Sequence, residues 1–272
     1  MDKKKLLIIG GAILIIVIII ILLILPKGNN TPAGGYVSSI VFAKSEDKNK
    51  NPIGTTDVFS VNDPEIHAII TYQGLPSGSN VDYQWYDVKA DKVLKEDKRP
   101  VPSAIFSGLS SAILARDQNT TWGLGDFEFR ILIDSKLYAK ATYQVKTDAE
   151  IQRTAIFSGI GEIELSTAVD LQGKPAKTPA TTFSKDDENI YASLSYQNLP
   201  ASVEMEARWK YVPGDLLITI YDKTLAGSNS FAFGINAQKD SWVPVKKWPV
   251  GKYQLEVYLN GDLFKTIEFS VQ

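Results

Sequence analysis

Apolar and polar residues alternate with a period of two along much of the chain. Within residues 253–259, YQLEVYL, every second side chain is apolar, and Asn260-Gly261 follows at once. Strict alternation predicts a strand with one buried face, and Asn-Gly predicts a type I′ hairpin turn. Residues 127–133 alternate in the same way before a turn near Asp134-Ser135. No long stretch beyond residue 36 has helical periodicity, so we expect an all-β fold.

The same pattern occurs twice. Residues 59–85 align with residues 183–209 without gaps, at a constant offset of 124 (183 − 59). The identical pairs are Phe59/Phe183, Ser60/Ser184, Asp63/Asp187, Ile66/Ile190, Ala68/Ala192, Tyr72/Tyr196, Gln73/Gln197, Leu75/Leu199, Pro76/Pro200 and Trp85/Trp209. Further on, Trp122-x-x-Gly matches Trp248-x-x-Gly at an offset of 126 (248 − 122). A period above 100 residues indicates duplicated domains rather than a solenoid.

We therefore predict two tandem antiparallel β-sandwich domains, residues 37–147 and 155–272, joined by a polar linker at 148–154. Each copy has a Leu-Pro turn before a strand that ends in Trp85 or Trp209, and a later Trp-x-x-Gly before a hairpin. These features resemble the immunoglobulin-like or fibronectin-type sandwich modules of microbial surface proteins. The resemblance implies a core role for Trp85 and Trp209, and it implies a fold without a specific activity.

The first residues predict a membrane anchor. Leu6–Leu25 carries no charge, and a helix of this length spans about 30 Å, the thickness of a bilayer core. Three lysines precede it, which predicts a cytoplasmic tail at 1–5 and domains outside the cytoplasm. Residues 26–36 then form a tether. The alternative is a cleaved signal peptide, whose apolar part is shorter and ends in a small-residue cleavage site; no such site follows closely.

Composition excludes several classes of function. The chain has no cysteine and one histidine, which rules out disulfides and thiolate metal sites and makes zinc or copper improbable. The formal net charge is -2, which does not suit a nucleic-acid backbone. A cysteine-free external protein is more typical of a bacterium or an archaeon than of a eukaryote.

Candidate chemistry is sparse. We expect His67 on the outward face of its strand, together with a solvated Glu128. Acidic turns precede the same strand in both copies, at 63–65 and 186–188. They could offer oxygen ligands to calcium, although Asp and Asn also favour turns through their own backbone. No Gly-rich phosphate loop or Gly-x-Ser-x-Gly motif is present, so we predict no catalytic residue, no metal and no cofactor.

Aromatic residues are the remaining candidates for binding. Trp242 and Trp248 lie in one loop near an end of the second domain, and Trp122 is the counterpart of Trp248. Aromatic rings on sandwich-end loops suit sugars or protein partners, and the alternative for each is packing over the core.

These observations predict a non-enzymatic, single-pass protein of the cell membrane. Its two external domains would contact a protein, a surface glycan or a wall polymer, and it would not bind nucleic acid. Two alternatives stay open. The chain could be an accessory subunit of a larger membrane complex, or a hydrolase with an unfamiliar site.

Overall fold

The structure, a computed structural model, describes residues 36–101, 106–117, 119–242 and 246–272. The chain divides into two compact units at Ile151/Gln152, and we call their described parts domain 1 and domain 2. The predicted anchor Leu6–Leu25 lies outside the described residues. Among the helices that the structure does describe, none has the length and apolar character needed to cross a membrane.

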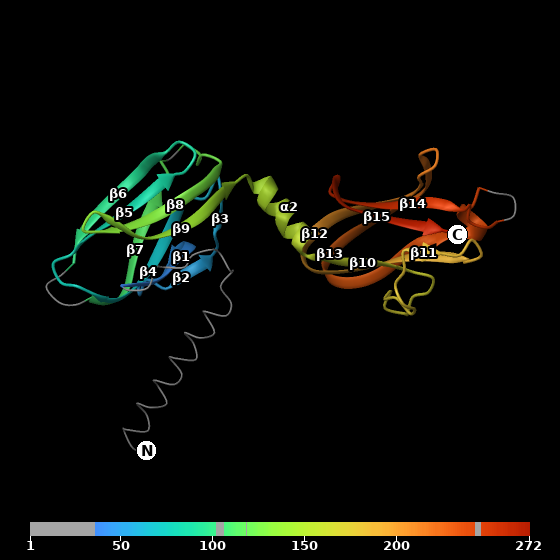
Figure 1. The fold of residues 1–272 in the computed structure, drawn as a ribbon, viewed down its shortest axis with the longest axis horizontal. Helices are drawn as coiled ribbons and strands as arrows, with labels where there is room; N and C mark the ends of the chain where they lie inside the picture. The colour runs from blue at the N-terminus through green and yellow to red at the C-terminus, as the bar shows by residue number, and fades with distance from the viewer. Residues whose placement is uncertain (1–35, 102–105, 118, 243–245) are drawn as a thin grey trace, which may run out of the picture. The chain divides into compact units, whose positions relative to one another are not determined.

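Domain 1 consists of two β-sheets, with strand orders β2-β1-β4-β7 and β3-β9-β8-β5-β6 (Figure 1). The strands are β1 (Val37–Glu46), β2 (Pro52–Thr55), β3 (Val58–Ser60), β4 (Glu65–Leu75), β5 (Asn80–Asp87), β6 (Lys92–Pro100), β7 (Phe106–Ala115), β8 (Gly125–Ile133) and β9 (Lys136–Lys146). Neighbouring strands are antiparallel except β3, which pairs with β9 in parallel. The apolar faces of both sheets enclose one core, which includes Trp85 and Phe129.

Domain 2 has equivalent strand pairs, but its longer strands join them into one six-stranded sheet of order β10-β12-β14-β15-β11, with β13 also paired with β12 (Figure 1). Its elements are β10 (Ile160–Ser166), β11 (Thr182–Phe183), β12 (Asn189–Tyr211), β13 (Leu216–Asn236), the short helix α3 (Ala237–Asp240), β14 (Gly251–Leu259) and β15 (Asp262–Val271). The first half of β12 pairs with the second half of β13 on one side and with β10 on the other. The second half of β12 pairs with the first half of β13 on one side and with β14 on the other. Strand β12 therefore corresponds to β4 plus β5 of domain 1, and β13 corresponds to β6 plus β7.

The strand register shows that the two domains are copies of one structure. Trp85 lies opposite Lys95, and Trp209 lies opposite Thr219, both at the offset of 124. A register shift follows the tryptophan in each domain. The predicted all-β sandwich and the core positions of Trp85 and Trp209 are confirmed, since the two side chains are 1% and 0% exposed.

The structure also locates the insertion that separates the two copies. Leu114 pairs opposite Ile66, and Ile235 pairs opposite Ile190, so the offset falls to 121 (235 − 114) in these strands. It then rises to 126 at Trp248. Domain 2 therefore lost three residues before this strand (124 − 121) and gained five after it (126 − 121). The gain includes α3, which has no counterpart in domain 1.

The turns follow the sequence closely. Asn260 and Gly261 both have positive φ, at 49° and 84°, as the predicted type I′ turn requires. Asp134 and Ser135 adopt the same conformation in domain 1, at 48° and 67°. Each turn connects the last two strands of its domain and fixes their register.

The segment 148–154, expected to be a linker, belongs instead to helix α2 (Asp148–Ser158). The helix begins with a capping box. The Thr147 hydroxyl accepts the Glu150 N–H at 3.2 Å, and the Glu150 carboxylate accepts the Thr147 N–H at 2.9 Å. Ile156, near its end, is buried in the core of domain 2. Helical periodicity is weak here because only this one side chain of the helix is buried.

Candidate functional site

The three candidate tryptophans lie in different environments. Trp248 is 2% exposed and belongs to the core of domain 2, so its ring offers no face to a ligand. Trp122 packs against the core of domain 1, and its indole Nε1–H donates to the Asp63 carbonyl at 2.6 Å. Both residues also donate their backbone N–H to equivalent carbonyls, those of Lys185 and Val61. They close the ends of their sandwiches.

Trp242 is the exposed member of the three. Its side chain is 41% exposed, and its ring lies against Tyr211, with 5.1 Å between the centroids. It follows α3 in the inserted segment, so domain 1 has no equivalent. Its partner Tyr211 donates its hydroxyl to the Val250 carbonyl at 3.1 Å, which fixes the position of the tyrosine ring. This aromatic pair is a surface specific to domain 2.

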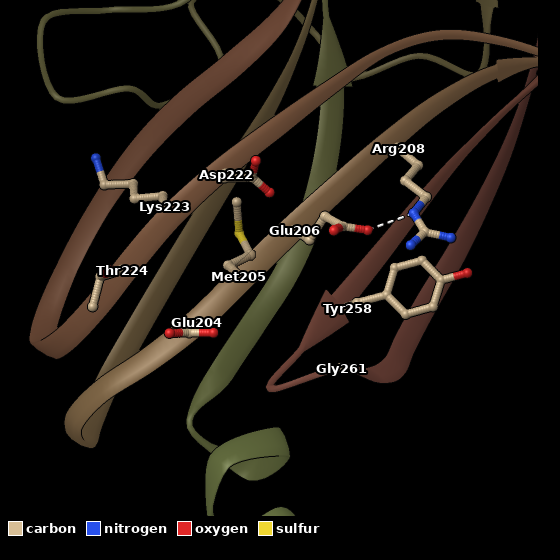
Figure 2. A pocket seen from close by; sticks show the side chains of 9 residues that line it. All are labelled: Glu204, Met205, Glu206, Arg208, Asp222, Lys223, Thr224, Tyr258 and Gly261. Carbon is tan, nitrogen blue, oxygen red and sulfur yellow. Dashed lines mark hydrogen bonds and ion pairs between the residues drawn. The ribbon is translucent and has the colours of Figure 1, made fainter.

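A second feature of domain 2 is a hollow on the outer face of the sheet formed by β13, β12 and β14 (Figure 2). We call it the acidic hollow. Its volume is about 540 Å³. It is lined by Glu204, Met205, Glu206, Arg208, Asp222, Lys223, Thr224, Tyr258 and Gly261. The alternation of β12 directs Glu204, Glu206 and Arg208 outward while their neighbours enter the core.

One side of the acidic hollow is a closed network of charges. The Arg208 guanidinium donates to Glu206 and lies over the Tyr258 ring, 4.6 Å from its centroid (Figure 2). The hydrogen bond to Glu206 raises the pKa of Arg208 above its ordinary value. Tyr258 in turn donates its hydroxyl to Glu256, at 2.9 Å. These contacts hold the cation in place rather than leaving it free for a ligand.

The same network continues to the next outward residue of β12. Lys210 contacts Glu256 at 3.0 Å. Burial alone would raise the pKa of Glu256, but hydrogen bonds from Lys210 and Tyr258 outweigh it, so this pKa is lowered. Both partners therefore stay charged at neutral pH, and the pair supports the face beside the hollow.

The other side of the acidic hollow has unpaired acids. Within the described residues, the carboxylates of Glu204 and Asp222 form no hydrogen bond and no ion pair, and Figure 2 shows both at the hollow. Lys223 faces away from them, because its ammonium lies over the Phe231 ring at 4.2 Å. The hollow can therefore accept a cationic group.

The equivalent face of domain 1 has a different set of charges. Glu128 contacts both Arg130 and Lys140 at 2.7 Å. Asp82, at the register of Glu206, has no cation partner among the described residues and accepts a hydrogen bond from Gln84 at 3.0 Å. Asn80 and Lys98 are at the registers of Glu204 and Asp222, so this face lacks the two free acids of domain 2.

Two expected surface residues are buried, which corrects the sequence interpretation. Glu128 is on the outward phase of β8, as expected, but it is 7% exposed because Arg130 and Lys140 cover it. Burial would raise its pKa, whereas the hydrogen bonds from the two cations lower it below the ordinary value.

His67 is also covered, although its strand phase is outward. It is 4% exposed, and its Nε2 lies 3.0 Å from Glu65 while its Nδ1 lies 3.8 Å from Glu46. Glu46 is held over this part of the sheet by the Ser111 hydroxyl, at 3.0 Å. The imidazole therefore contacts acids of both β1 and β4.

The acidic turns that could have held calcium use their carboxylates locally. Asp63 accepts the Ser60 N–H at 2.8 Å and pairs with Lys44, and Asp187 accepts the Ser184 N–H at 2.8 Å. In the part of the chain that the structure describes, no three His, Asp or Glu residues are grouped in a way that could hold a metal ion.

The sheets and enclosed cores of both domains define the chain as a tandem β-sandwich protein. No known protein family model matches the chain. No curated protein matches it either. Among solved structures, the chain is similar to the calcium-binding domain CBD12 of CALX1.1, with 9% identity, a TM-score of 0.30, and coverage of 74% of this chain and 75% of that one. It is also similar to CBD12 from CALX1.2, with 11% identity, a TM-score of 0.29, and coverage of 76% and 80%.

Proposed function

We propose that the protein is a membrane-anchored, extracytoplasmic binding protein whose tandem domains contact a protein or an envelope polymer. The anchor Leu6–Leu25 and its flanking lysines support the location. Domain 2 supplies the main contact surface, and domain 1 spaces it from the membrane.

The divergence between the two copies carries this proposal. Their cores keep the same residues at equivalent positions, such as Trp85 and Trp209. The equivalent outer faces differ: domain 1 has Asn80 and Lys98 where domain 2 has the free acids Glu204 and Asp222 beside a hollow. Exposed charges without internal partners contribute little to folding, so a partner is the better reason for keeping them together.

The proposal is tested by cross-linking the full chain in its native membrane and identifying what is attached to it. A double variant, Glu204→Lys with Asp222→Lys, reverses the free charges of the hollow. Glu164→Lys is the matched control, since this acid is exposed on β10, which pairs with the first half of β12 and does not line the hollow. Polymer binding is followed in parallel by co-sedimentation of the same variants with isolated envelope material.

We expect a defined cross-linked partner, or co-sedimentation, that the double variant loses and the Glu164→Lys control keeps. The opposite result is that the wild-type chain neither cross-links to a partner nor co-sediments, or that the double variant cross-links and co-sediments as the wild type does. In that case the outer face of domain 2 is not a contact surface.

A further inference from the structure

The first half of β13, residues 216–225, is an open edge of its sheet. It pairs with β12 on one side, and no other described strand pairs with it. The second half of β13 is covered, because the Ser230 hydroxyl donates to the Gln172 carbonyl at 2.9 Å and Gly173 lies against the backbone of Phe231. We call residues 216–225 the open edge. Its unpaired backbone groups can accept a further strand.

The equivalent edge of domain 1, β6, is protected by charge. Its middle residues are Lys95, Glu96 and Asp97, followed by Lys98, Arg99 and Pro100, whereas the open edge has Thr219, Ile220, Tyr221, Asp222, Lys223 and Thr224 at the same register. Charges that point inward from an edge strand, and proline without an N–H, prevent edge-to-edge pairing. Arg99 and Asp97 are paired with each other on that inward phase. The middle of the open edge has no proline, and its one inward charge, Lys223, lies over the Phe231 ring at 4.2 Å instead of pairing with an acid on the same strand.

The open edge instead exposes several apolar side chains. Leu216, Leu217 and Ile220 are 40%, 46% and 44% exposed. Domain 1 shares apolar residues at the start of its edge, Val93 and Leu94, so the difference lies in the central residues. Tyr221, which replaces an aspartate, stacks on Phe233 of the core with 5.0 Å between the ring centroids. This inward side chain therefore packs on the core of the sandwich and does not repel a strand added at the edge.

The charges along the open edge indicate which kind of strand would fit beside it. On the outer face, Ile220, Asp222 and Thr224 follow one another along the open edge. Asp222 has no cationic partner in the described residues, and Glu204 lies opposite Thr224 on β12. A strand added at about 4.8 Å from β13 would bring its own outward side chains alongside these residues. A lysine or arginine there can reach both carboxylates, while a β-branched residue can cover Ile220.

We propose that the open edge of domain 2 binds an extended protein segment by adding it as an antiparallel strand, with basic residues beside Asp222 and Thr224 and apolar residues beside Ile220 and Leu217. Backbone hydrogen bonds supply affinity, and the alternate side chains supply specificity. This inference rests on the proposed binding function and names the chemistry of the partner.

The test uses the full chain and a labelled, blocked synthetic peptide, Thr-Lys-Thr-Lys-Thr-Ile-Thr-Val-Thr. In antiparallel register its lysines lie beside Thr224 and Asp222, and its isoleucine lies beside Ile220. Binding is followed by fluorescence anisotropy. One control peptide has aspartate in place of both lysines, and a second has N-methyl groups on alternate backbone nitrogens along the paired edge. We expect saturable binding of the first peptide and loss of binding with both controls.

Protein variants place the binding on the open edge. Ile220→Lys puts a cation diagonal to a lysine of the peptide, and Asp222→Lys reverses the charge that faces this lysine. Each should weaken binding of the lysine peptide by more than about tenfold, because a like charge then faces the added strand. Leu171→Glu, at a fully exposed apolar residue away from the edge, should change nothing. Circular dichroism checks that all variants are folded.

Three results overturn the inference: no binding of the lysine peptide, binding that survives N-methylation, or binding that Ile220→Lys leaves intact. A wild-type chain that forms a dimer abolished by Ile220→Lys, without binding the peptide, would assign the edge to a second copy of the chain instead. Native-membrane cross-linking that depends on Glu204 and Asp222 would in those cases still support the proposed function, so the two failures are distinguishable.

Discussion

Replacement of Trp209 by alanine should destabilise domain 2 and leave domain 1 intact. The side chain is fully buried on β12 and lies between Phe233 and Phe269, with ring centroids 6.2 Å and 5.8 Å away. Trp85 has the equivalent role in domain 1, beside Phe129 at 4.8 Å. The two tryptophans therefore give matched perturbations of the two copies.

The expected magnitude follows from burial and from one missing hydrogen bond. An indole buries about 200 Å² more than alanine, and about 25 cal/mol per Å² gives about 5 kcal/mol. The Nε1–H of Trp209 has no acceptor among the described residues, and burying such a donor costs about 1–3 kcal/mol. The difference is about 2–4 kcal/mol, and the range of about 3–5 kcal/mol known for buried aromatics narrows the expected cost of Trp209→Ala to about 3–4 kcal/mol. Trp209→Phe should cost only about 1 kcal/mol, since it keeps a ring and removes the unpaired donor.

Hydrogen exchange read by mass spectrometry measures the two domains separately in the same chain. We expect the slowest amides of domain 2 to exchange about 100- to 1,000-fold faster in Trp209→Ala, and those of domain 1 to be unchanged. Trp85→Ala should give the mirror result. Loss of protection in both domains from either variant would refute the description of two independently stabilised cores, and a change below about tenfold would refute the magnitude.

Two further predictions concern single residues. Glu128 has a lowered pKa in the folded domain because the hydrogen bonds from Lys140 and Arg130 outweigh its burial. Its contribution to the free energy of unfolding is therefore complete above the unfolded pKa of about 4.3, and it is lost as the pH falls through the folded pKa. Acid titration of unfolding should show this loss in the wild type and not in Glu128→Gln, which should cost about 1–2 kcal/mol at neutral pH; identical acid profiles would contradict it. Gly234→Ala should cost about 1–3 kcal/mol in denaturant titrations, because a Cβ there would meet the Cα of Tyr191 at 2.9 Å, and a neutral effect would show that the strands can separate.

The sequence was sufficient for the β elements and for the duplication. Alternation placed the buried faces of β8 and β14, and the Asn260-Gly261 dipeptide gave its turn, because these depend on neighbouring residues alone. Helix α2 was missed although Thr147 and Glu150 form a capping-box signature. It buries only Ile156, so it lacks the apolar stripe on which a helix prediction depends.

The candidate site could be predicted only in part. Trp242 was correctly separated from the aligned positions, since it lies in an insertion. The burial of His67 and Glu128 could not be predicted, because strand phase does not show that side chains from other strands cover an outward residue. The acidic hollow and the open edge depend on which strands are neighbours, and in particular on the pairing of β13 with β12 alone. The pairing of β13 with β12 can be inferred from the sequence only after the strands of the two domains have been aligned with each other.

The most direct test of the account is site-specific photo-cross-linking in the native membrane. A benzoylphenylalanine replaces Ile220 on the open edge of domain 2 in one chain, and Glu96, its counterpart on β6 of domain 1, in another. The account predicts a cross-link to a partner protein from position 220 and none from position 96. Equal cross-linking from both positions, or none from position 220, would contradict it.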